Sequence, residues 1–495
     1  MNPDIAAARA RLTPQRPALQ FRGRWYCYAE LDHRAQKLAV RLHAAGVRRG
    51  DRVAIMATNH IAHVDLLLAA PRLGYIATPF NTRLSADEQT RLARYVEPVL
   101  MLHDHACASL AAATGVPLRA LDDYEDWLAT AEDRALPDAG IGGEDPAMLL
   151  FTGGSTGLPK GALIPHRQLF YNAVNTCFSW GVGEHDCAIQ ATPAFHAAFN
   201  VLTTPLLHAG GRVILQEGFE AGEYLRLVER ERVTLMFLVP TMFQMLAEHA
   251  DFATTDFSSV RWTISGGAPC PEPVQQAFRA RGVRFKQGYG MTEAGVNCFA
   301  IDVEEAQRRP DSVGKPVLHA QAVIRAADGQ PVARGEIGEL TLAGPHLMLG
   351  YFRRPEETAQ TLRDGWLWTG DLAREDADGF FYIVGRRKDM YISGGENVYP
   401  AEVEAALAQC AGVAECAVVG VPDSRWGEVG LAAVRLAPGV QMDAQTLRAA
   451  LKQRLAGYKV PKHVLFLESL PKSGAGKILK SEIRRLFEQE NGCVH

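Results

Sequence analysis

LLFTGGSTGLPKG, residues 149–161, joins an apolar run to a glycine-rich loop that ends in a lysine. The apolar residues indicate a strand from which the loop leaves. Glycines permit backbone conformations that other side chains forbid, and the hydroxyl and N–H groups of such a loop can surround phosphate oxygens. The GxxxxGK[ST] spacing of a Walker loop is absent. The segment therefore predicts a phosphate-binding loop at the end of a strand, and a flexible surface turn is the alternative.

The rest of the N-terminal part alternates between helical and strand patterns. Apolar residues recur at helical spacing over residues 31–42, and a second helical stretch is expected near 64–68. Strands are expected at 51–56, 213–215 and 234–239. Such alternation predicts an α/β fold with a mostly parallel, helix-covered sheet.

The C-terminal part has a different texture. Over residues 312–384 short segments are separated by Gly and Pro, which predicts a small antiparallel or barrel-like subdomain. The chain then reads as a compact α+β unit with helices at 401–410 and 443–455, and strands at 416–421, 431–436 and 463–467. We expect a large domain over residues 1–385 and a small mobile domain over 386–495. The Ala-rich stretch 111–140 is expected to be a surface connection.

Composition limits the class of protein. The chain has 495 residues, 47% hydrophobic and 22% charged, with a net charge of −4, so several domains are expected and a nucleic-acid partner is not. Nine scattered cysteines with no metal-ligand spacing favour reduced thiols and a cytoplasmic setting. The start has no apolar signal core, and the most apolar stretch, 233–246, is too short to span a bilayer. A soluble protein is expected, and peripheral membrane contact and a homodimer are left open.

Two further segments add acidic groups beside glycines. In QGYGMTE, residues 287–293, Glu293 follows a hydroxyl and could hold Mg²⁺ beside a phosphate, while Tyr289 could stack on a base. Alone, this segment fits a polar turn at a strand end equally well. In WLWTGDL, residues 366–372, Asp371 could accept hydrogen bonds from two ribose hydroxyls, although a lone Asp is more often a turn residue.

Two basic segments lie nearer the C-terminus. GRRKDMYISGGENVYP, residues 385–400, places a charged cluster and two glycines where the composition changes, which fits a hinge between domains. LPKSGAGKI, residues 470–478, places Lys477 after a glycine loop, from which it could reach a developing negative charge. A solvated basic turn and a solvated lysine are the alternatives.

In this order and with these spacings, the five segments resemble the adenylate-forming superfamily: acyl- and aryl-CoA synthetases, adenylation domains of peptide synthetases, and firefly-type luciferases. The resemblance covers residues 28–485, and further matching segments are 81–85, 193–196, 239–243, 266–269 and 335–340. It implies a large N-terminal domain of helix-covered sheets with a small barrel-like subdomain, followed by a small mobile α+β domain. Many members have Ser-Gly-Thr-Thr-Gly where this chain has Gly153–Gly157, but the hydroxyl and glycine chemistry is retained.

The resemblance implies roles for particular residues. Thr292 matches the α-phosphate ligand, Thr156 and Glu293 the magnesium ligands, and Asp371 and Arg386 the ribose contacts. The implied ATP and AMP site comprises Thr152, Gly153, Gly154, Ser155, Thr156, Gly157, Lys160, Gly267, Ala268, Pro269, Gly288, Tyr289, Gly290, Met291, Thr292, Asp371 and Arg386.

Further roles follow from the same resemblance. Lys477 matches the lysine that bridges the carboxylate and the α-phosphate, and Lys388 occupies the hinge position. Gly394, Gly395 and Glu396 match the stretch that borders the coenzyme A tunnel. The implied catalytic residues are Lys477, His196, Thr292 and Glu293.

The acyl pocket is expected to be apolar. His196 resembles the residue at its mouth, and Ile264 lies where plant hydroxycinnamate ligases carry a lysine. Asn297 is the polar residue expected near its floor. The expected pocket residues are His196, Ala197, Ala198, Ile264, Gly266, Gly295 and Asn297. These favour an apolar acid, either a medium- or long-chain fatty acid or an unhydroxylated aryl acid.

The predicted function is an ATP-dependent acyl-CoA synthetase, an AMP-forming acid–thiol ligase that uses a small-molecule carboxylic acid, ATP, Mg²⁺ and coenzyme A. Alternatives are transfer to a carrier protein and a hydroxycinnamate-type aryl-CoA ligase. A luciferase and a non-catalytic nucleotide-binding regulator are two more; the regulator would have lost Lys477 or Glu293, and both are present.

Overall fold

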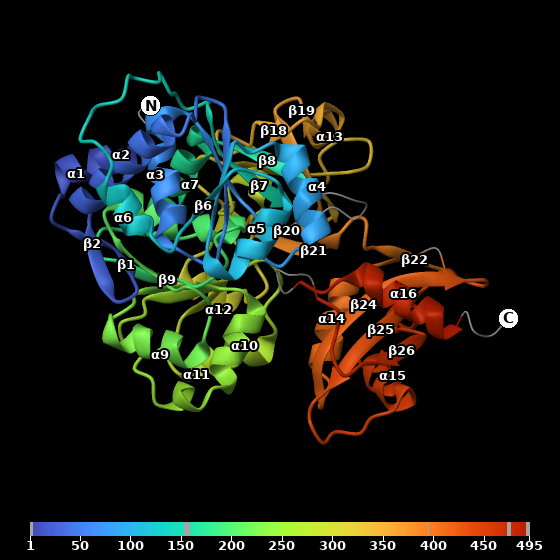
Figure 1. Ribbon diagram of the computed structural model, residues 1–495. Helices are drawn as coiled ribbons and strands as arrows, with labels where there is room; N and C mark the ends of the chain where they lie inside the picture. Colours follow the sequence, from blue (N-terminus) through green and yellow to red (C-terminus); the bar gives the residue numbers. More distant parts are fainter. Residues whose placement is uncertain (1–2, 153–158, 395, 473–476, 492–495) are drawn as a thin grey trace. The chain divides into compact units, whose positions relative to one another are not determined.

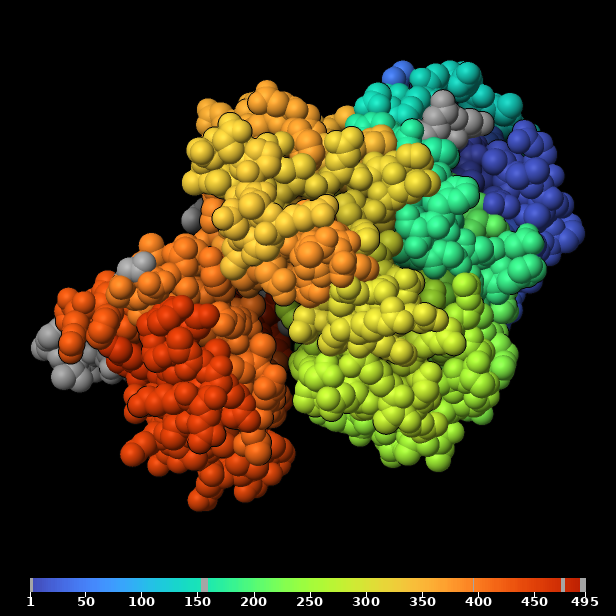
Figure 2. Space-filling view, turned by 180° about the vertical axis from the view of Figure 1, so that it is seen from behind, coloured from blue at the N-terminus to red at the C-terminus, as the bar shows by residue number. Residues whose placement is uncertain are grey.

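The computed structural model describes residues 3–152, 159–394, 396–472 and 477–491. It contains two compact units. The first comprises Met1–Cys270, Val274–Ala322 and Leu342–Leu367, and the second comprises Pro271–Pro273, Val323–Thr341 and Trp368–His495. Within the first unit, N-terminal residues (blue) and residues from the middle of the chain (green) share one body (Figure 2).

One large sheet of the first unit has seven strands. Its strands are parallel except for the hairpin of its last two members. In spatial order they are β13 (Phe285–Gln287), β12 (Trp262–Ser265), β11 (Leu235–Leu238), β9 (Cys187–Gln190), β10 (Arg212–Leu215), β1 (Pro17–Phe21) and β2 (Arg24–Cys27). The predicted parallel sheet is confirmed.

The second seven-stranded sheet holds the glycine-rich segment. Its order is β18 (Gly350–Tyr351), β8 (Lys160–Pro165), β7 (Pro146–Thr152), β4 (Ile76–Pro79), β3 (Arg52–Met56), β5 (Leu100–His103) and β6 (Leu118–Ala120). β7 and β8 are antiparallel, and Thr152 lies opposite Lys160. The glycine-rich segment therefore leaves a strand, as predicted, and its two ends return to neighbouring positions.

Helices cover these sheets (Figure 1). The predicted helix over 31–42 lies within α2, whose apolar side is buried. The helices before residue 400 are α1 (Ile5–Leu12), α2 (Tyr28–Ala44), α3 (Ile61–Leu73), α4 (Ala86–Val96), α5 (Ala108–Ala113), α6 (Tyr124–Ala129), α7 (His166–Trp180), α8 (Thr203–Ala209), α9 (Ala221–Arg230), α10 (Pro240–Glu248), α11 (Glu272–Ala280), α12 (Val303–Arg308) and α13 (Pro355–Thr361). The 3₁₀ helices are η1 (His105–Cys107), η2 (Ala197–Asn200), η3 (Ala250–Ala253), η4 (Thr292–Ala294) and η5 (Gly457–Lys459).

The stretch 111–140 was wrongly predicted as a surface connection throughout. It includes β6 and α6, and Tyr124 of α6 is buried and donates a hydrogen bond to Asp65 at 3.0 Å. Aromatic burial and this hydrogen bond anchor the segment despite its many alanines. Residues 130–140 form its longest part without a helix or strand.

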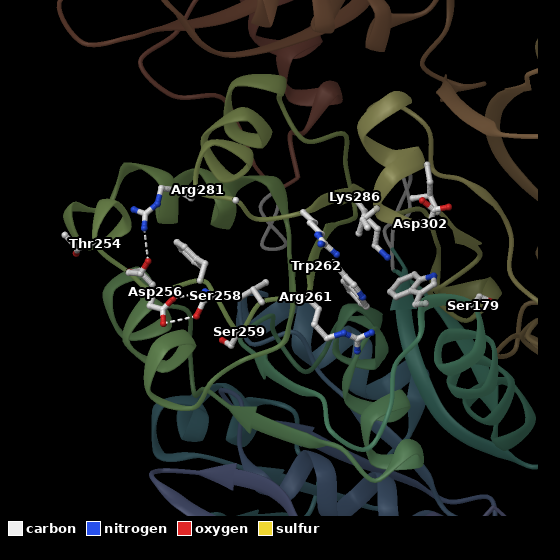
Figure 3. Close-up of a pocket in the computed structure, with 18 residues that line it drawn as sticks. Ser179, Thr254, Asp256, Ser258, Ser259, Arg261, Trp262, Arg281, Lys286 and Asp302 are labelled. Carbon is white, nitrogen blue, oxygen red and sulfur yellow. Dashed lines mark hydrogen bonds between the residues drawn. The ribbon is translucent and has the colours of Figure 1, made fainter.

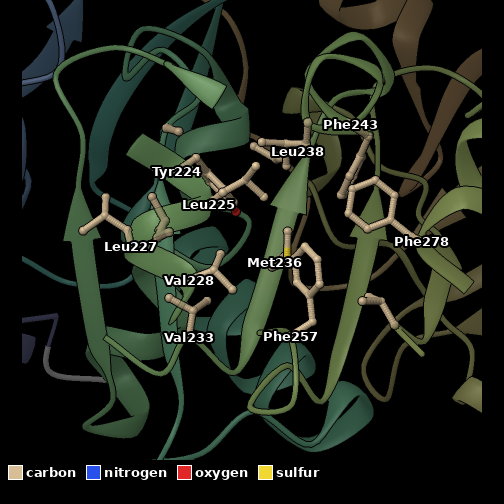
Figure 4. Close-up of a cluster of buried hydrophobic side chains, with 14 of the residues drawn as sticks. Tyr224, Leu225, Leu227, Val228, Val233, Met236, Leu238, Phe243, Phe257 and Phe278 are labelled. Carbon is tan, nitrogen blue, oxygen red and sulfur yellow. The ribbon is translucent and has the colours of Figure 1, made fainter. Parts of the chain in front are cut away.

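A core of aromatic and aliphatic side chains packs between the parallel sheet and α9, α10 and α11 (Figures 1 and 4). Phe243, Phe278 and Phe285 form ring pairs within this core, with centroids 5.1–6.1 Å apart. Edge-to-face and tilted pairs of this kind add stability beyond the burial of apolar area. The core includes side chains of β11 and β13, so the loops that follow these strands start from rigid positions.

The small subdomain predicted over 312–384 corresponds to a five-stranded sheet, antiparallel where β20 pairs with β19 and β21. Its strands are β16 (Gln321–Arg325), β17 (Gly338–Ala343), β20 (Trp366–Glu375), β19 (Leu362–Arg363) and β21 (Phe381–Arg386). A separate two-stranded sheet pairs β14 (Phe299–Ala300) with β15 (Lys315–Pro316).

The C-terminal part has its own sheet, with apolar side chains packed on both faces. Its elements are β22 (Tyr391–Ser393), β23 (Glu396–Val398), α14 (Pro400–Ala408), β24 (Val413–Asp423), β25 (Gly427–Leu436), α15 (Ala444–Lys452), β26 (His463–Phe466) and α16 (Lys480–Asn491). The predicted α+β unit is thus present. The second compact unit also includes residues before 386, so a domain boundary at 385/386 stays a prediction. None of the described helices is both long and apolar enough to cross a membrane.

Candidate active site

Lys160 of the glycine-rich segment and Glu293 of the second motif meet at one tyrosine. The Tyr351 hydroxyl donates a hydrogen bond to Glu293 Oε1 at 2.8 Å. Lys160 Nζ lies 4.9 Å from the centroid of the Tyr351 ring. Both Glu293 and Tyr351 are buried, and burial and the nearby Glu293 charge raise the pKa of Tyr351, which therefore stays a hydrogen-bond donor. The predicted phosphate-loop lysine and magnesium ligand thus lie in one cluster.

The backbone around Glu293 is held from two sides. Met348 N–H donates to the Glu293 carbonyl at 2.9 Å, and the Gln168 side chain of α7 donates to the Thr292 carbonyl at 2.9 Å. Sequence reasoning missed Tyr351 and Gln168. Tyr351 lies in a segment that stands out in the sequence only for its glycines and prolines. No charge or spacing marks it as a partner of Glu293.

Tyr351→Phe should weaken magnesium binding without disturbing the fold. The change removes the hydroxyl that orients Glu293, and loss of such a partner of a metal ligand typically costs ~10–100-fold in metal affinity. A Mg²⁺ titration of pyrophosphate release should therefore shift to higher concentration, with an unchanged melting temperature. An unshifted titration would show that Tyr351 does not orient Glu293 for a metal.

Glu293 fits a magnesium ion that arrives with a nucleotide. No group of three or more His, Cys, Asp or Glu side chains among the described residues could hold a metal by itself. Magnesium in phosphoryl-transfer sites usually takes one or two carboxylates plus phosphate oxygens. Glu293 would hold the ion, which would supply neutralising charge to the phosphates. Thr156, the other predicted ligand, lies outside the described residues, as do Gly153, Gly154, Ser155 and Gly157.

The predicted adenine segments lie side by side at the carboxyl ends of β12 and β13. The Gly288 N–H donates to the Ser265 carbonyl at 2.7 Å. Gly266 is buried, whereas residues 267–269 are exposed after it. A Cβ at Gly290 would lie 1.8 Å from the Val296 carbonyl oxygen, so this position requires glycine. Ligands bind at this edge of parallel sheets.

The residues around Gly290 form a tight turn. Gly295 and Val296 have φ of 75° and 61°, and a β-branched residue rarely adopts the left-handed region. Tyr289 packs edge-on against Phe299, with ring centroids 5.8 Å apart. Met291 immediately precedes η4, which contains Thr292 and Glu293. The turn therefore fixes the positions of Tyr289, Thr292 and Glu293 at the end of the sheet.

In the second unit, the two predicted ribose contacts are neighbours. Arg386 Nε lies 3.0 Å from Asp371 Oδ1, and the two residues are paired across β20 and β21. Buried Glu339 accepts hydrogen bonds from Gly370 N–H at 3.0 Å and from Arg387 Nη1 at 2.8 Å. Sequence reasoning gave Glu339 no role, but it anchors the turn that carries Asp371.

The predicted acyl-pocket residues come from several elements. His196 precedes η2, which contains Ala197 and Ala198, and all three are partly exposed. Ile264 is buried in β12, and its Cδ1 lies 3.0 Å from where a Cβ of Gly288 would be. The pocket role of these residues stays a prediction.

Asn297 belongs to a buried group of side-chain amides. Its amide donates to Thr176 Oγ1 at 2.7 Å and to the Val201 carbonyl at 2.9 Å. The Asn172 amide donates to the Asn200 carbonyl at 3.0 Å. The side-chain oxygens of Asn172, Asn200 and Asn297 accept no hydrogen bond from any described residue. The three residues are neighbours in the fold, and their buried side-chain oxygens have no donor among the residues that the structure describes.

The predicted hinge and coenzyme A residues lie in exposed loops of the second unit. Lys388 is exposed in a turn after β21, and Glu396 is exposed at the start of β23. Gly394 N–H donates to the Trp426 carbonyl at 2.9 Å, and a Cβ at Gly394 would lie 2.7 Å from the Trp426 ring. Gly395 lies outside the described residues.

Trp426 is a candidate that the sequence did not reveal. Its ring is partly exposed, with Lys462 Nζ at 4.6 Å and the Arg425 guanidinium at 5.0 Å from its centroid. An aromatic face flanked by two cations beside Gly394 suits a ligand that combines a base with phosphates. Lys477 is exposed just before Ile478, which pairs with Lys472.

Two family models match the chain: the AMP-binding enzyme family over residues 6–352 and the AMP-binding enzyme C-terminal domain over residues 402–477. This chain belongs to the AMP-binding enzyme family. Feruloyl-CoA synthase of an Amycolatopsis species is 44% identical over 482 residues, which cover 97% of each chain. Indoleacetate–CoA ligase of Aromatoleum aromaticum is 35% identical over 494 residues, also 97% of each.

Solved structures of this family share the fold. ATP-bound MatB from Rhodopseudomonas palustris matches with a TM-score of 0.90 and 31% identity over 99% of each chain. The o-succinylbenzoate CoA synthetase MenE from Bacillus subtilis, with its acyl-adenylate intermediate, matches with a TM-score of 0.88 and 31% identity over 97% of this chain and 98% of that one. The predicted superfamily, fold class and enzyme class, an AMP-forming acid–thiol ligase, are confirmed. The predicted ATP, Mg²⁺ and coenzyme A agree with these relatives, and the individual residue roles stay predictions.

Proposed function

We propose that this chain is an ATP-dependent aryl-CoA synthetase for phenolic arylpropenoic acids. The carboxylate oxygen attacks the α-phosphorus of ATP, the bond to pyrophosphate breaks, and an acyl-adenylate forms. The coenzyme A thiol then attacks the acyl carbon, loses its proton, and releases AMP. Among the sequence-based alternatives, this choice favours the hydroxycinnamate-type ligase over a fatty-acid enzyme. It also departs from the unhydroxylated aryl acid that the sequence favoured.

The cluster of Lys160, Tyr351 and Glu293 supports the nucleotide half of this proposal. It places one cation and one buried carboxylate at the mouth of the glycine-rich segment, where triphosphate charge would be neutralised. Asp371 and Arg386 would receive the ribose, and Lys477 would act on the oxygens that gain charge as the carboxylate attacks.

The observation that carries the substrate class is the group of unsatisfied amide oxygens on Asn172, Asn200 and Asn297. A buried acceptor without a donor costs about 1–3 kcal/mol. A phenolic hydroxyl would supply a donor, whereas a fatty acyl chain has none. The apolar side chains of Ala198 and Ile264 would contact the ring. Ferulate, the acid in the name of the relative feruloyl-CoA synthase, carries such a hydroxyl.

A pyrophosphate-release screen across carboxylic acids, with and without coenzyme A, tests the proposal. We expect 4-hydroxycinnamate and its methoxylated form to exceed cinnamate, and cinnamate to exceed octanoate and palmitate, in kcat/KM. Acyl-CoA should appear only with coenzyme A. Fastest turnover of a saturated fatty acid would overturn the substrate assignment while leaving the reaction class intact.

Asn297→Leu should lower discrimination between phenolic and unhydroxylated acids. A site built to hydrogen-bond a substrate hydroxyl loses ~10-fold or more in selectivity when a partner is removed. We therefore expect the kcat/KM ratio of 4-hydroxycinnamate to cinnamate to fall by about that factor. Because Asn297 also bonds Thr176 and Val201, the ratio is measured rather than absolute activity, which a general packing defect would change for both acids. An unchanged ratio would remove Asn297 from the acyl site.

We also propose a cytoplasmic location, because all eight described cysteines are free, as expected in a reducing compartment. A homodimer and peripheral membrane contact stay predictions.

A further inference from the structure

A pocket of about 840 Å³ lies in the first unit, where β12 and β13 begin (Figure 3). This is the amino-terminal edge of the parallel sheet, whereas Gly266 and Gly288 follow the carboxyl ends of the same strands. The pocket is therefore separate from the candidate active site. Its volume is within the range of small-molecule sites.

Lys286 of β13 lies at the inner wall of this pocket. The residue is only 3% exposed and lies beside Trp262 (Figure 3). Its Nζ is 4.1 Å from the centroid of the Trp262 ring and 5.7 Å from that of Trp180. The ammonium makes no hydrogen bond or ion pair with any residue that the structure describes. The face of an aromatic ring attracts a cation, but it does not replace the oxygen acceptors of ordinary hydrogen bonds. A buried ammonium with unmet donors is costly unless a partner arrives.

The other charged groups of the pocket are mostly satisfied within the protein. Arg261 pairs with Asp186 at 2.8 Å, and Arg281 donates to the carbonyls of Phe252 and Thr255 at 2.7 and 2.9 Å. Asp256 pairs with Arg232 at 2.9 Å. Asp302 accepts from the first N–H groups of α12 and lies beyond ion-pair distance of Lys286.

Arg284 supplies a second donor at the mouth. It is exposed and lines the pocket, and its guanidinium has no hydrogen-bond or ion-pair partner among the described residues. The pocket thus offers one buried cation, one exposed cation and two indole rings. This combination suits a ligand with a single negative charge. A second negative charge on the buried part of the ligand would have no further cation to pair with among the described residues.

We propose that this pocket binds a small organic carboxylate, whose oxygens accept hydrogen bonds from Lys286. Arg284 would contact the outer part of the ligand. The site is a second ligand site on the chain and goes beyond the proposed synthetase reaction. Burial lowers the pKa of Lys286 to about 8. Because the carboxylate should bind only the protonated form of Lys286, its binding should raise the pKa of this lysine.

Calorimetric titration of the full chain with benzoate tests the proposal. In the wild type we expect a benzoate site that is lost in Lys286→Met and weakened about tenfold in Arg284→Met. Lys452→Met, which removes the exposed charge at the end of α15, is the control and should retain this site. Asn297→Leu should leave this site unchanged, so failure of the substrate proposal is distinguishable from failure of this one.

A pH series gives a second measurement that needs no variant at Lys286. The affinity of the second site should be constant below pH 8 and fall about tenfold per unit above it, as Lys286 loses its proton. The other charged groups that line the pocket are Asp256, Asp302, Arg261, Arg281 and Arg284. Aspartate and arginine side chains ordinarily titrate far from pH 8. A wild type without a benzoate site, or with benzoate binding that persists unchanged in Lys286→Met, would overturn the proposal. Displacement of benzoate by equimolar inorganic phosphate would instead assign the pocket to inorganic oxyanions and overturn the carboxylate assignment.

Discussion

Lys477→Ala is expected to reduce pyrophosphate release by ~10²–10³-fold, because one charge-stabilising donor at a phosphoryl centre is worth about that factor. Lys477 is exposed beside Ile478 in the second unit, so its removal should not disturb packing. Substrate affinity should change little, since the charge it meets is largest in the transition state. Quench-flow assay of pyrophosphate measures the effect.

The control uses the second half-reaction. Supplied with synthetic acyl-adenylate and coenzyme A, Lys477→Ala should form acyl-CoA at nearly the wild-type rate. Lys472→Ala, at the position that pairs with Ile478, removes an equal charge and should leave both half-reactions intact. Normal pyrophosphate release by Lys477→Ala would show that the lysine has no part in adenylation.

Lys388→Pro is expected to give the opposite pattern, with acyl-adenylate formed and then accumulated. Lys388 lies in the exposed turn between Arg386 and Met390, and its N–H makes no hydrogen bond within the described residues. Proline fixes φ near −65°, which would prevent rotation about this residue. We expect thioester formation to fall ~10²-fold, which is the typical cost when reacting groups are misplaced.

Lys388→Ala provides the matched comparison, because it removes the same side chain without restricting the backbone. It should retain both half-reactions. A chemical quench followed by chromatography would separate bound acyl-adenylate from acyl-CoA. Equal discharge by coenzyme A in the Pro and Ala variants would move the hinge away from residue 388.

Local patterns in the sequence predicted the fold well where they reflect packing. The apolar spacing over 31–42 corresponds to the buried side of α2. The run at 213–215 lies within β10, and the run at 234–239 contains β11. The glycine-rich segment was correctly placed at a strand end because apolar residues precede it. The order and spacing of the five segments then indicated the family, because together they are far more specific than any one of them.

The partners of the motifs were not predictable in the same way. Tyr351 meets Glu293 across 58 positions of sequence, and no charge or period links them. Asn172 and Thr176 of α7 are polar but buried, with hydrogen bonds to Asn200 and Asn297, and no sequence pattern marks this contact. Lys286 is similar, because lysine is rarely buried and only the positions of Trp180 and Trp262 reveal its surroundings.

The central claim, that an aryl acid is activated by attack on the α-phosphorus of ATP, is tested most directly by isotope transfer. 4-Hydroxycinnamate labelled with ¹⁸O in its carboxylate would be converted with ATP and coenzyme A, and the products analysed by mass spectrometry. One ¹⁸O should appear in the AMP phosphoryl group and none in pyrophosphate. Label in inorganic phosphate with release of ADP, or acyl-CoA formed with unlabelled AMP, would contradict the account.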